Sequence, residues 1–226
     1  NNFTDIRKGE NPHEEKMLDI EAGYTYNTKI VALGVNLYYM LYRDQLVQTG
    51  ELSDTGELLS RNVKNSYRRG VELSLAVNAT KWFSLGGNAT LSQNHILDYV
   101  DYIDEVAFER GRTTIAYSPA VIAGTFFDFH THGFVARLST RYVSKQYLTN
   151  GEYEDLSLPH YCVSDLDLGY TLRTSKVERV RFGVKIGNLF NAKYCTSGYG
   201  GSWLEGATLA DRKSWACYFP QATISA

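Results

Sequence analysis

The chain passes through Leu18-Asp19-Ile20-Glu21-Ala22-Gly23-Tyr24-Thr25-Tyr26, in which every second side chain is apolar or aromatic. Successive side chains of a β-strand point to opposite faces, so this period of two predicts a strand with one apolar and one polar face. The same alternation recurs at 31–39, 71–78, 83–92, 165–172 and 180–187. No segment shows the period of an amphipathic helix. The sequence therefore predicts an all-β fold.

The predicted strands are long, and their connections alternate in length. We expect strands at 16–27, 30–48, 66–79, 82–95, 113–129, 133–148, 160–173, 178–190 and from about 213 onward. The short connections are 27–29, 80–81, 130–133 and 174–177, and the long ones are 49–65, 96–112, 149–159 and 191–212. Many of these strands exceed the usual five to six residues. Short turns at one end and long loops at the other are typical of an outer-membrane β-barrel.

The composition of the chain further limits the classes of protein to which it can belong. A net charge of −2 over 226 residues gives no reason to expect a nucleic-acid partner. No run of 18 apolar residues is present, so no transmembrane helix is predicted. Cys162, Cys195 and Cys217 are too few for a disulfide framework, and a bridge between the last two stays open. Because the chain opens on Asn1 without a signal peptide, we expect it to be a piece of a longer polypeptide.

Alternation alone does not separate a membrane barrel from a soluble β-sandwich. Both architectures have one apolar face and one polar face on each strand. Strand length, the alternation of turns and loops, and the aromatic residues near strand ends favour the barrel. In a barrel the polar face lines the lumen, and we expect these charged residues there: Asp19, Glu21, Glu72, Asp165, Asp167, Arg181 and Lys185.

Four short strings resemble passages of the TonB-dependent outer-membrane receptor family. They are a loop-to-strand passage at 11–24, an Arg-Gly strand at 67–74, the Asn188-Leu189-Phe190-Asn191-Ala192-Lys193-Tyr194 string, and a strand opening at 218–222. They occur in the family's order, and the match covers essentially the whole chain. The family's last strand ends in an aromatic residue, whereas this chain stops at Ala226.

The resemblance implies an antiparallel transmembrane β-barrel segment, about nine strands of a 22-stranded barrel. Short turns would be periplasmic and long loops extracellular. Residues 1–226 would form the C-terminal part of the barrel, with the plug domain and the N-terminal strands absent from this chain. The location implied is the bacterial cell outer membrane. The partners implied are outer-membrane lipid, the plug of the same polypeptide, the TonB complex through that plug, and an extracellular small-molecule ligand.

The function implied is TonB-energised uptake of a scarce ligand such as an iron chelate, haem or cobalamin. No catalytic constellation stands out, so we expect no enzyme. No metal site and no cofactor are expected. A passive porin-type barrel and a soluble β-sandwich binding module remain the alternatives.

Aromatic residues in the long loops are the candidate ligand contacts. Side chains of this type in the mouth of a barrel stack on flat or ring-shaped ligands. The candidates are Tyr99, Tyr102, Tyr153, Tyr199 and Trp203.

Overall fold

The computed structural model describes residues 13–52, 58–104, 106–173 and 178–225, with the side chains of 48–52 and 58 left out. Nearly all regular structure in these residues is β-strand. The elements are β1 (Lys16–Asn27), β2 (Val31–Leu52), β3 (Leu58–Val77), β4 (Phe83–Ile103), β5 (Val106–Thr114), β6 (Val121–Thr131), β7 (Phe134–Val143), β8 (Gln146–Tyr147), the 3-10 turn η2 (Glu154–Leu156), β9 (Ser157–Leu158), β10 (Tyr161–Leu172), β11 (Val180–Ile186), β12 (Cys195–Leu204), the 3-10 turn η3 (Leu209–Asp211) and β13 (Arg212–Pro220).

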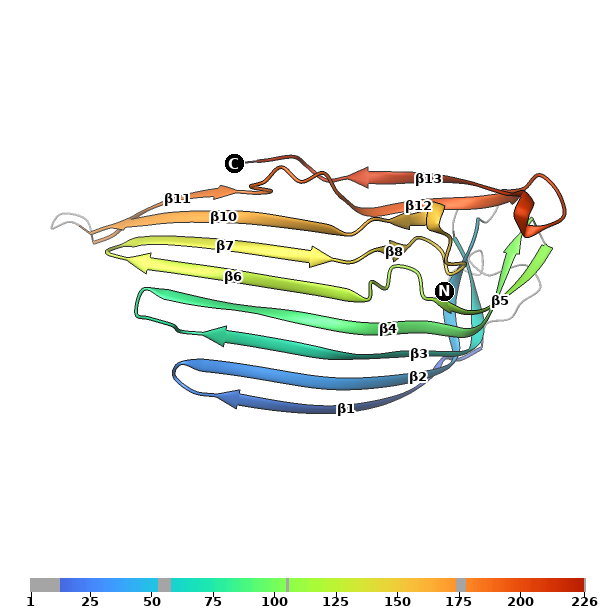
Figure 1. Ribbon diagram of the computed structural model, residues 1–226, viewed down its shortest axis with the longest axis horizontal. Coiled ribbons are helices and arrows are strands. Elements are labelled where there is room, and N and C mark those ends of the chain that lie inside the picture. The colour runs from blue at the N-terminus through green and yellow to red at the C-terminus, as the bar shows by residue number, and fades with distance from the viewer. Residues whose placement is uncertain (1–12, 53–57, 105, 174–177, 226) are drawn as a thin grey trace.

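The main sheet is an antiparallel meander in which each strand pairs with the next crossing strand. Its order is β1-β2-β3-β4-β6-β7-β10-β11, and β5 pairs with the far end of β4. Tight turns join the strands at one end of the sheet, which we name the turn end, and long extensions project from the other, the loop end (Figure 1). The predicted layout of short turns opposite long connections is confirmed. The connection 174–177 lies outside the described residues.

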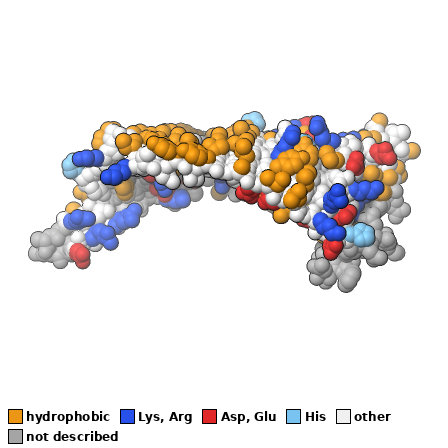
Figure 2. All heavy atoms as spheres, turned by 90° about the horizontal axis from the view of Figure 1, so that it is seen from below, with side chains coloured by type: hydrophobic (Ala, Val, Ile, Leu, Met, Phe, Trp, Pro, Cys, Tyr) orange, Lys and Arg blue, Asp and Glu red, His pale blue; other side chains and the backbone are white. Residues whose placement is uncertain are grey.

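One face of the sheet is apolar and convex. Because directly paired residues share a face, the pairing traces rows across the strands. One such row runs through Tyr24, Val35, Leu73, Ala89, Ala123 and Tyr142. Figure 2 shows a hydrophobic band on the convex side of the curved sheet and charged side chains on the concave side. A single curved sheet with an exposed apolar face is a barrel segment, so the β-sandwich alternative is excluded for the described residues.

The concave face is polar and hydrogen-bonded across strands. The Asn36 side-chain amide donates to Glu21 at 3.2 Å and to Glu72 at 3.3 Å. Arg137 makes a two-pronged ion pair with Asp128, with both N···O distances at 2.7 Å. The pairing places all seven charged residues predicted to line the lumen on this face. A hollow of about 770 Å³ lies along it between β1 and β10.

Aromatic rings mark the turn end of the apolar face. The ring of Phe83 stacks on that of Phe129 at 4.6 Å, and Trp82 stacks on Phe129 at 6.2 Å. Phe134, Tyr170 and Phe182 continue the belt, since they are paired in register across β7, β10 and β11. An aromatic belt at one edge of an apolar band is the arrangement seen where barrels meet a membrane interface.

The predicted single strand at 113–129 is wrong. The structure ends β5 at Thr114 and begins β6 at Val121. Pro119 has no N–H to donate to a ladder, and Tyr117 has a φ of 53°, so the chain turns between the two strands. The interpretation of 49–65, 96–112 and 191–212 as long loops is also wrong in part. These segments contain the end of β2, the start of β3, the end of β4, most of β5, and β12.

The Asn188–Tyr194 string forms a corner that joins β11 to the C-terminal segment. The Asn188 side chain accepts from the Ala192 N–H at 2.8 Å and donates to the Ala192 carbonyl at 2.9 Å and the Ala222 carbonyl at 3.3 Å. Its own N–H donates to Asp165 at 2.8 Å. Beyond this corner Gly187 bridges Ser225 in antiparallel fashion. The last predicted strand therefore begins as β13, paired with β12, and reaches β11 only near its end.

Candidate ligand site at the loop end

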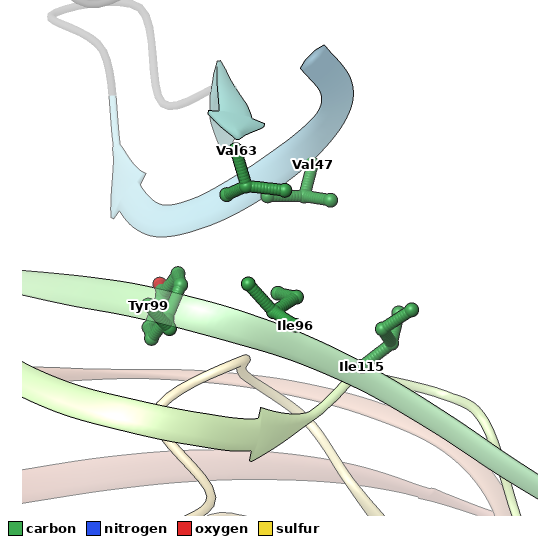
Figure 3. Close-up of a cluster of buried hydrophobic side chains, with 5 residues drawn as sticks. All are labelled: Val47, Val63, Ile96, Tyr99 and Ile115. Atoms are coloured by element: carbon green, nitrogen blue, oxygen red, sulfur yellow. The ribbon is translucent and has the colours of Figure 1, made fainter. Parts of the chain in front are cut away.

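The β2–β3 ribbon bends over the β4–β5 hairpin at the loop end. Asp44 has a φ of 54° in the left-handed region, where Asn and Asp are tolerated best, and its carbonyl accepts from the Asn62 amide at 2.5 Å. Beyond this bend the side chains of the ribbon meet those of the hairpin in a buried cluster (Figure 3). The cluster is formed by Val47, Val63, Ile96, Tyr99 and Ile115.

A second buried cluster anchors the remaining extensions. It consists of Ile103, Leu148, Tyr153, Leu156 and Leu158, and the partly buried Phe108, Leu204, Leu209 and Ala216 pack against it. These residues come from β4, β5, the segment between β8 and η2, η2 itself, β9, β12, η3 and β13. The long connections of this region are therefore packed against one another.

A buried carboxyl group lies between the two clusters. Asp101 is 5% exposed and accepts from the Tyr153 hydroxyl at 2.7 Å and the Tyr99 hydroxyl at 3.4 Å. Burial raises the pKa of Asp101, and the Tyr153 hydrogen bond and the nearby Arg110 offset only part of this rise. Asp101 thus joins the clusters at an electrostatic cost.

Two guanidinium groups lie close to the Tyr153 ring. Arg110 is 4.7 Å and Arg212 is 3.8 Å from its ring centroid. Arg212 also forms an ion pair with Asp155, which accepts a hydrogen bond from the Ser214 hydroxyl as well. Although burial acts in the opposite direction, these donors hold the pKa of Asp155 below its ordinary value. Tyr153 and Asp155 therefore attach the η2 segment to the β12–β13 ribbon.

The β12–β13 ribbon carries exposed aromatic rings on the face turned away from η2. The register of the two strands places four aromatic side chains on this face, which we name the aromatic face. They are Tyr199, Trp203, Trp215 and Phe219. These residues are between 39% and 49% exposed. The Tyr199 ring lies edge-on to Trp215 at 5.4 Å and tilted against Phe219 at 5.7 Å. Such a surface offers ring faces and edges to a flat ligand.

The opposite face of the ribbon is held against the protein. A Cβ at Gly200 would lie 2.9 Å from Leu156 Cδ2, so the absence of a side chain there lets the two segments approach. The Tyr117 hydroxyl donates to the Gly198 carbonyl, and Arg212 forms an ion pair with Asp155 of η2. The aromatic face is thus presented by a ribbon anchored from behind.

The structure divides the five candidate ligand contacts into two groups. Tyr99 and Tyr153 are buried, at 1% and 8% exposure, and support the loop-end clusters. Tyr102 is half-buried beneath the Arg61 guanidinium, which lies 4.8 Å from its ring centroid. Tyr199 and Trp203 are exposed on the aromatic face. Sequence reasoning missed Trp215 and Phe219. Cys217 is paired with Tyr199, and the two aromatic residues lie two positions before and after Cys217, so they share the face of Tyr199.

The three cysteine residues are free thiols. Cys195 is paired with Pro220 and Cys217 with Tyr199, so the two residues left open as a bridge lie at different levels of the ribbon. In the described part of the chain, no group of three or more His, Cys, Asp or Glu residues is placed to hold a metal ion. The described residues also include no helix long and apolar enough to cross a membrane.

The raised pKa of Asp101 predicts a pH dependence of the loop-end packing. The carboxyl group of Asp101 binds its proton more tightly in the folded state than in the unfolded chain. The stabilisation that the protonated group gives to the folded state is therefore complete at pH values below the ordinary carboxyl pKa. It is lost as the pH rises through the raised pKa. We expect the protection of the Leu148 amide, which donates to the Leu156 carbonyl, to fall over that window after correction for intrinsic exchange rates.

Asp101→Asn is the matched variant for this measurement. It keeps the size of the side chain but cannot ionise, so the difference between wild type and variant isolates Asp101 from Asp155, whose slope has the opposite sign. Equal pH profiles of amide exchange in the two proteins would contradict the prediction.

Comparison with known proteins places this fold in a family. The sequence model described as "TonB dependent receptor-like, beta-barrel" matches residues 11–189, which is most of the chain. The chain therefore belongs to the TonB-dependent receptor family, as a part of its β-barrel. A search of curated protein sequences finds no match.

Solved structures of receptors share the fold at low sequence identity. The ferric yersiniabactin uptake receptor FyuA from Yersinia pestis is 21% identical with a TM-score of 0.64, over 93% of this chain and 28% of the receptor. The ferric-catecholate import receptor Fiu from E. coli K12 is 18% identical with a TM-score of 0.66, over 99% and 29%. The siderophore receptor PiuA from Acinetobacter baumannii is 15% identical with a TM-score of 0.63, over 91% and 27%. The chain thus spans less than a third of each of these receptors.

Proposed function

We propose that this chain is the C-terminal part of the barrel of a bacterial outer-membrane receptor that takes up a scarce ligand with energy from TonB. The observation that carries the proposal is the family match over residues 11–189 on a sheet with an apolar convex face and a polar concave face. In this proposal the convex face meets lipid, the turn end is periplasmic, and the loop end is extracellular. Transport rather than catalysis is the activity proposed.

The concave face would meet a plug domain carried elsewhere in the same polypeptide. Its hollow is lined by hydrogen-bonding groups from several strands, including Asn88, Ser139 and Arg141, which suit a polar protein surface better than a lipid. Coupling to the TonB complex would pass through that plug.

The ligand class that we propose is an iron chelate, with haem and cobalamin as the alternatives. The receptors for ferric yersiniabactin and for ferric catecholates, whose fold this chain shares, favour the first class. Tyr199 and Trp203 would contact the ligand directly, whereas Tyr99 and Tyr153 would hold the ribbon that presents them. Tyr102 would contribute from below Arg61.

Uptake by cells tests the function as a whole. Cells that express the complete native polypeptide are supplied with radiolabelled ferric catecholate, ferric hydroxamate, haem or cobalamin, in the presence and absence of TonB. We expect accumulation of one of these that depends on both the receptor and TonB. Accumulation that is the same without TonB would favour the passive porin, and no accumulation of any of the four would contradict the proposed ligand class.

Truncation of the exposed rings should weaken ligand binding. We expect Trp203→Ala and Tyr199→Ala each to raise the Kd of the transported ligand about tenfold, because each removes a ring contact of about 1.4 kcal/mol. Calorimetry on the purified full-length protein measures this change. Trp82→Ala is the control, since Trp82 is 53% exposed but lies at the turn end. An equal loss of affinity in the control, or none in either loop-end variant, would remove the aromatic face from the binding site.

A further inference from the structure

The convex face carries a positively charged position inside its apolar surface. Arg69 is paired with Tyr39 on one side and with Gln93 on the other, in the row just above Leu37, Val71 and Leu91. Residues of these two rows share the convex face, so the guanidinium group lies where apolar side chains give way to polar ones on approaching the loop end. This position faces the surroundings of the barrel and not its lumen.

A groove runs between the two rows. It has a volume of about 550 Å³ and is lined by apolar side chains on its turn-end side and by Tyr39, Arg69 and Gln93 on its loop-end side. Gly70 and Ser92 form its floor, and their side-chain positions belong to the concave face. The groove thus has an apolar wall and a cationic wall.

Neighbouring side chains hold Arg69 in place. Its Nε and Nη2 atoms both donate to Gln93 Oε1, at 2.9 Å and 2.6 Å, and its guanidinium carbon lies 5.3 Å from the Tyr67 ring centroid. Tyr67 is itself stacked on Tyr39 and meets His95 edge-on. The bonds to Gln93 use one edge of the guanidinium, so the Nη1 donors remain for another acceptor.

No negative charge on this surface balances Arg69. Within 16–26, 31–43, 65–77 and 83–95, where the pairing of β1 to β4 is regular, the convex-face positions carry Lys16, Arg43 and Arg69 but no Asp or Glu. Lys16 has a partner in Glu14 at 3.0 Å. The described residues include no carboxylate in an ion pair with Arg69. An arginine held by a neutral amide beside an apolar groove is suited to a phosphate group, which accepts paired guanidinium hydrogen bonds.

We propose that Arg69 and this groove bind a membrane lipid with a phosphorylated headgroup, with its phosphate on Arg69 and the start of its acyl chain along Leu37, Val71 and Leu91. The apolar wall complements the chain and the cationic wall complements the headgroup, in the order that a lipid presents them at a bilayer boundary. The occupant is a lipid of the leaflet that surrounds the loop end. This inference rests on the proposed insertion of the barrel in a membrane.

Lipid retention by the complete native polypeptide tests the proposal. The protein is placed in phosphatidylethanolamine nanodiscs that contain lipid A, released, and examined by native mass spectrometry for bound lipid A. We expect Arg69→Gln to lower retention about tenfold, since a charge-assisted hydrogen bond to phosphate is lost. Lys81→Gln, which removes a cation at the turn end, should retain as much lipid A as wild type.

Two further measurements show which part of the lipid the site recognises. Dephosphorylated lipid A should be retained no better by wild type than by Arg69→Gln. Inorganic phosphate in the buffer should not displace lipid A at concentrations that leave the bilayer intact, because it lacks the acyl chain. Displacement by inorganic phosphate, or equal retention of lipid A by wild type and Arg69→Gln, would overturn the proposal.

A second variant tests the same site in case Arg69→Gln does not fold. Gln93→Leu leaves the charge but removes the acceptor that orients it, and we expect a several-fold loss of lipid A retention. Unchanged retention in this variant would also count against the site. Membrane insertion and ligand uptake are measured on the same proteins. If the wild-type protein does not insert into the membrane, the proposed function fails. If it inserts and takes up its ligand, but Arg69→Gln retains as much lipid A as wild type, only this inference is refuted.

Discussion

Asn188→Ala should lower the free energy of unfolding by about 3–5 kcal/mol, the largest loss expected from any single side chain of the corner. Asn188 is 5% exposed and makes three side-chain hydrogen bonds, to the Ala192 N–H, the Ala192 carbonyl and the Ala222 carbonyl. Alanine would remove the side-chain partner of the N–H and carbonyl of half-buried Ala192 and of the carbonyl of Ala222, and would leave a void where the buried amide was. The loss should be seen in the urea midpoint of the full-length protein, monitored by its mobility shift on unheated gels.

Asn191→Ala is the matched control for this variant. Both asparagines lie in the left-handed region, with φ values of 50° and 52°, so the backbone strain of an alanine there is common to the two variants. Asn191 is exposed, and within the described part of the chain its side chain accepts one long hydrogen bond, of 3.4 Å, from the Ile224 N–H. We expect its replacement to cost about 1 kcal/mol. Equal losses in the two variants would show that strain, and not the hydrogen-bonded corner, sets the stability.

Leu73→Arg should destabilise the barrel in a membrane by about 2–4 kcal/mol, whereas Ser74→Arg should have little effect. Leu73 is 39% exposed on the convex face, two rows from Arg69 and three from Phe83 of the turn-end aromatic belt. A guanidinium at this level would replace a lipid-facing side chain near the middle of the apolar band. Ser74 is the next residue, but it faces the hollow on the concave side.

This pair separates the two faces with one chemical change at adjacent positions. Both variants are refolded into phosphatidylcholine vesicles, and their unfolding free energies are compared from guanidinium titrations. If the convex face meets lipid, only the variant at Leu73 loses stability. A larger loss for Ser74→Arg would reverse the assignment of the faces and would remove the basis for a membrane barrel.

The candidate site shows where sequence reasoning reaches its limit. Aromatic residues in long connections were a sound signal for the loop end, but the same signal selected buried Tyr99 and exposed Tyr199 alike. Burial at the loop end depends on which ribbon folds over which. Tyr99 is covered by Val47 and Val63, which are far from it in sequence, and no local pattern records that contact.

Apart from the strand predicted at 113–129 and the strand ends inside the predicted loops, the alternation of side chains by itself determined the crossing strands, their two faces and the layout of turns and loops. Those features follow from the period of two along a single strand, so they can be predicted without knowing which strand pairs with which. β1 begins and ends where the alternation predicted, at Lys16 and Asn27. The four strings at 11–24, 67–74, 188–194 and 218–222, taken together and in order, likewise indicated the family.

Only the tertiary structure decided how the long connections are organised. The bend at Asp44, the burial of Asp101 between two tyrosines, the anchoring of the β12–β13 ribbon and the groove beside Arg69 each depend on residues from different strands. A strand pattern specifies which side chains share a face, but not which distant ribbon packs upon that face. The free energy of such packing comes from contacts between segments that are remote in the chain, and these form only when the strands are assembled.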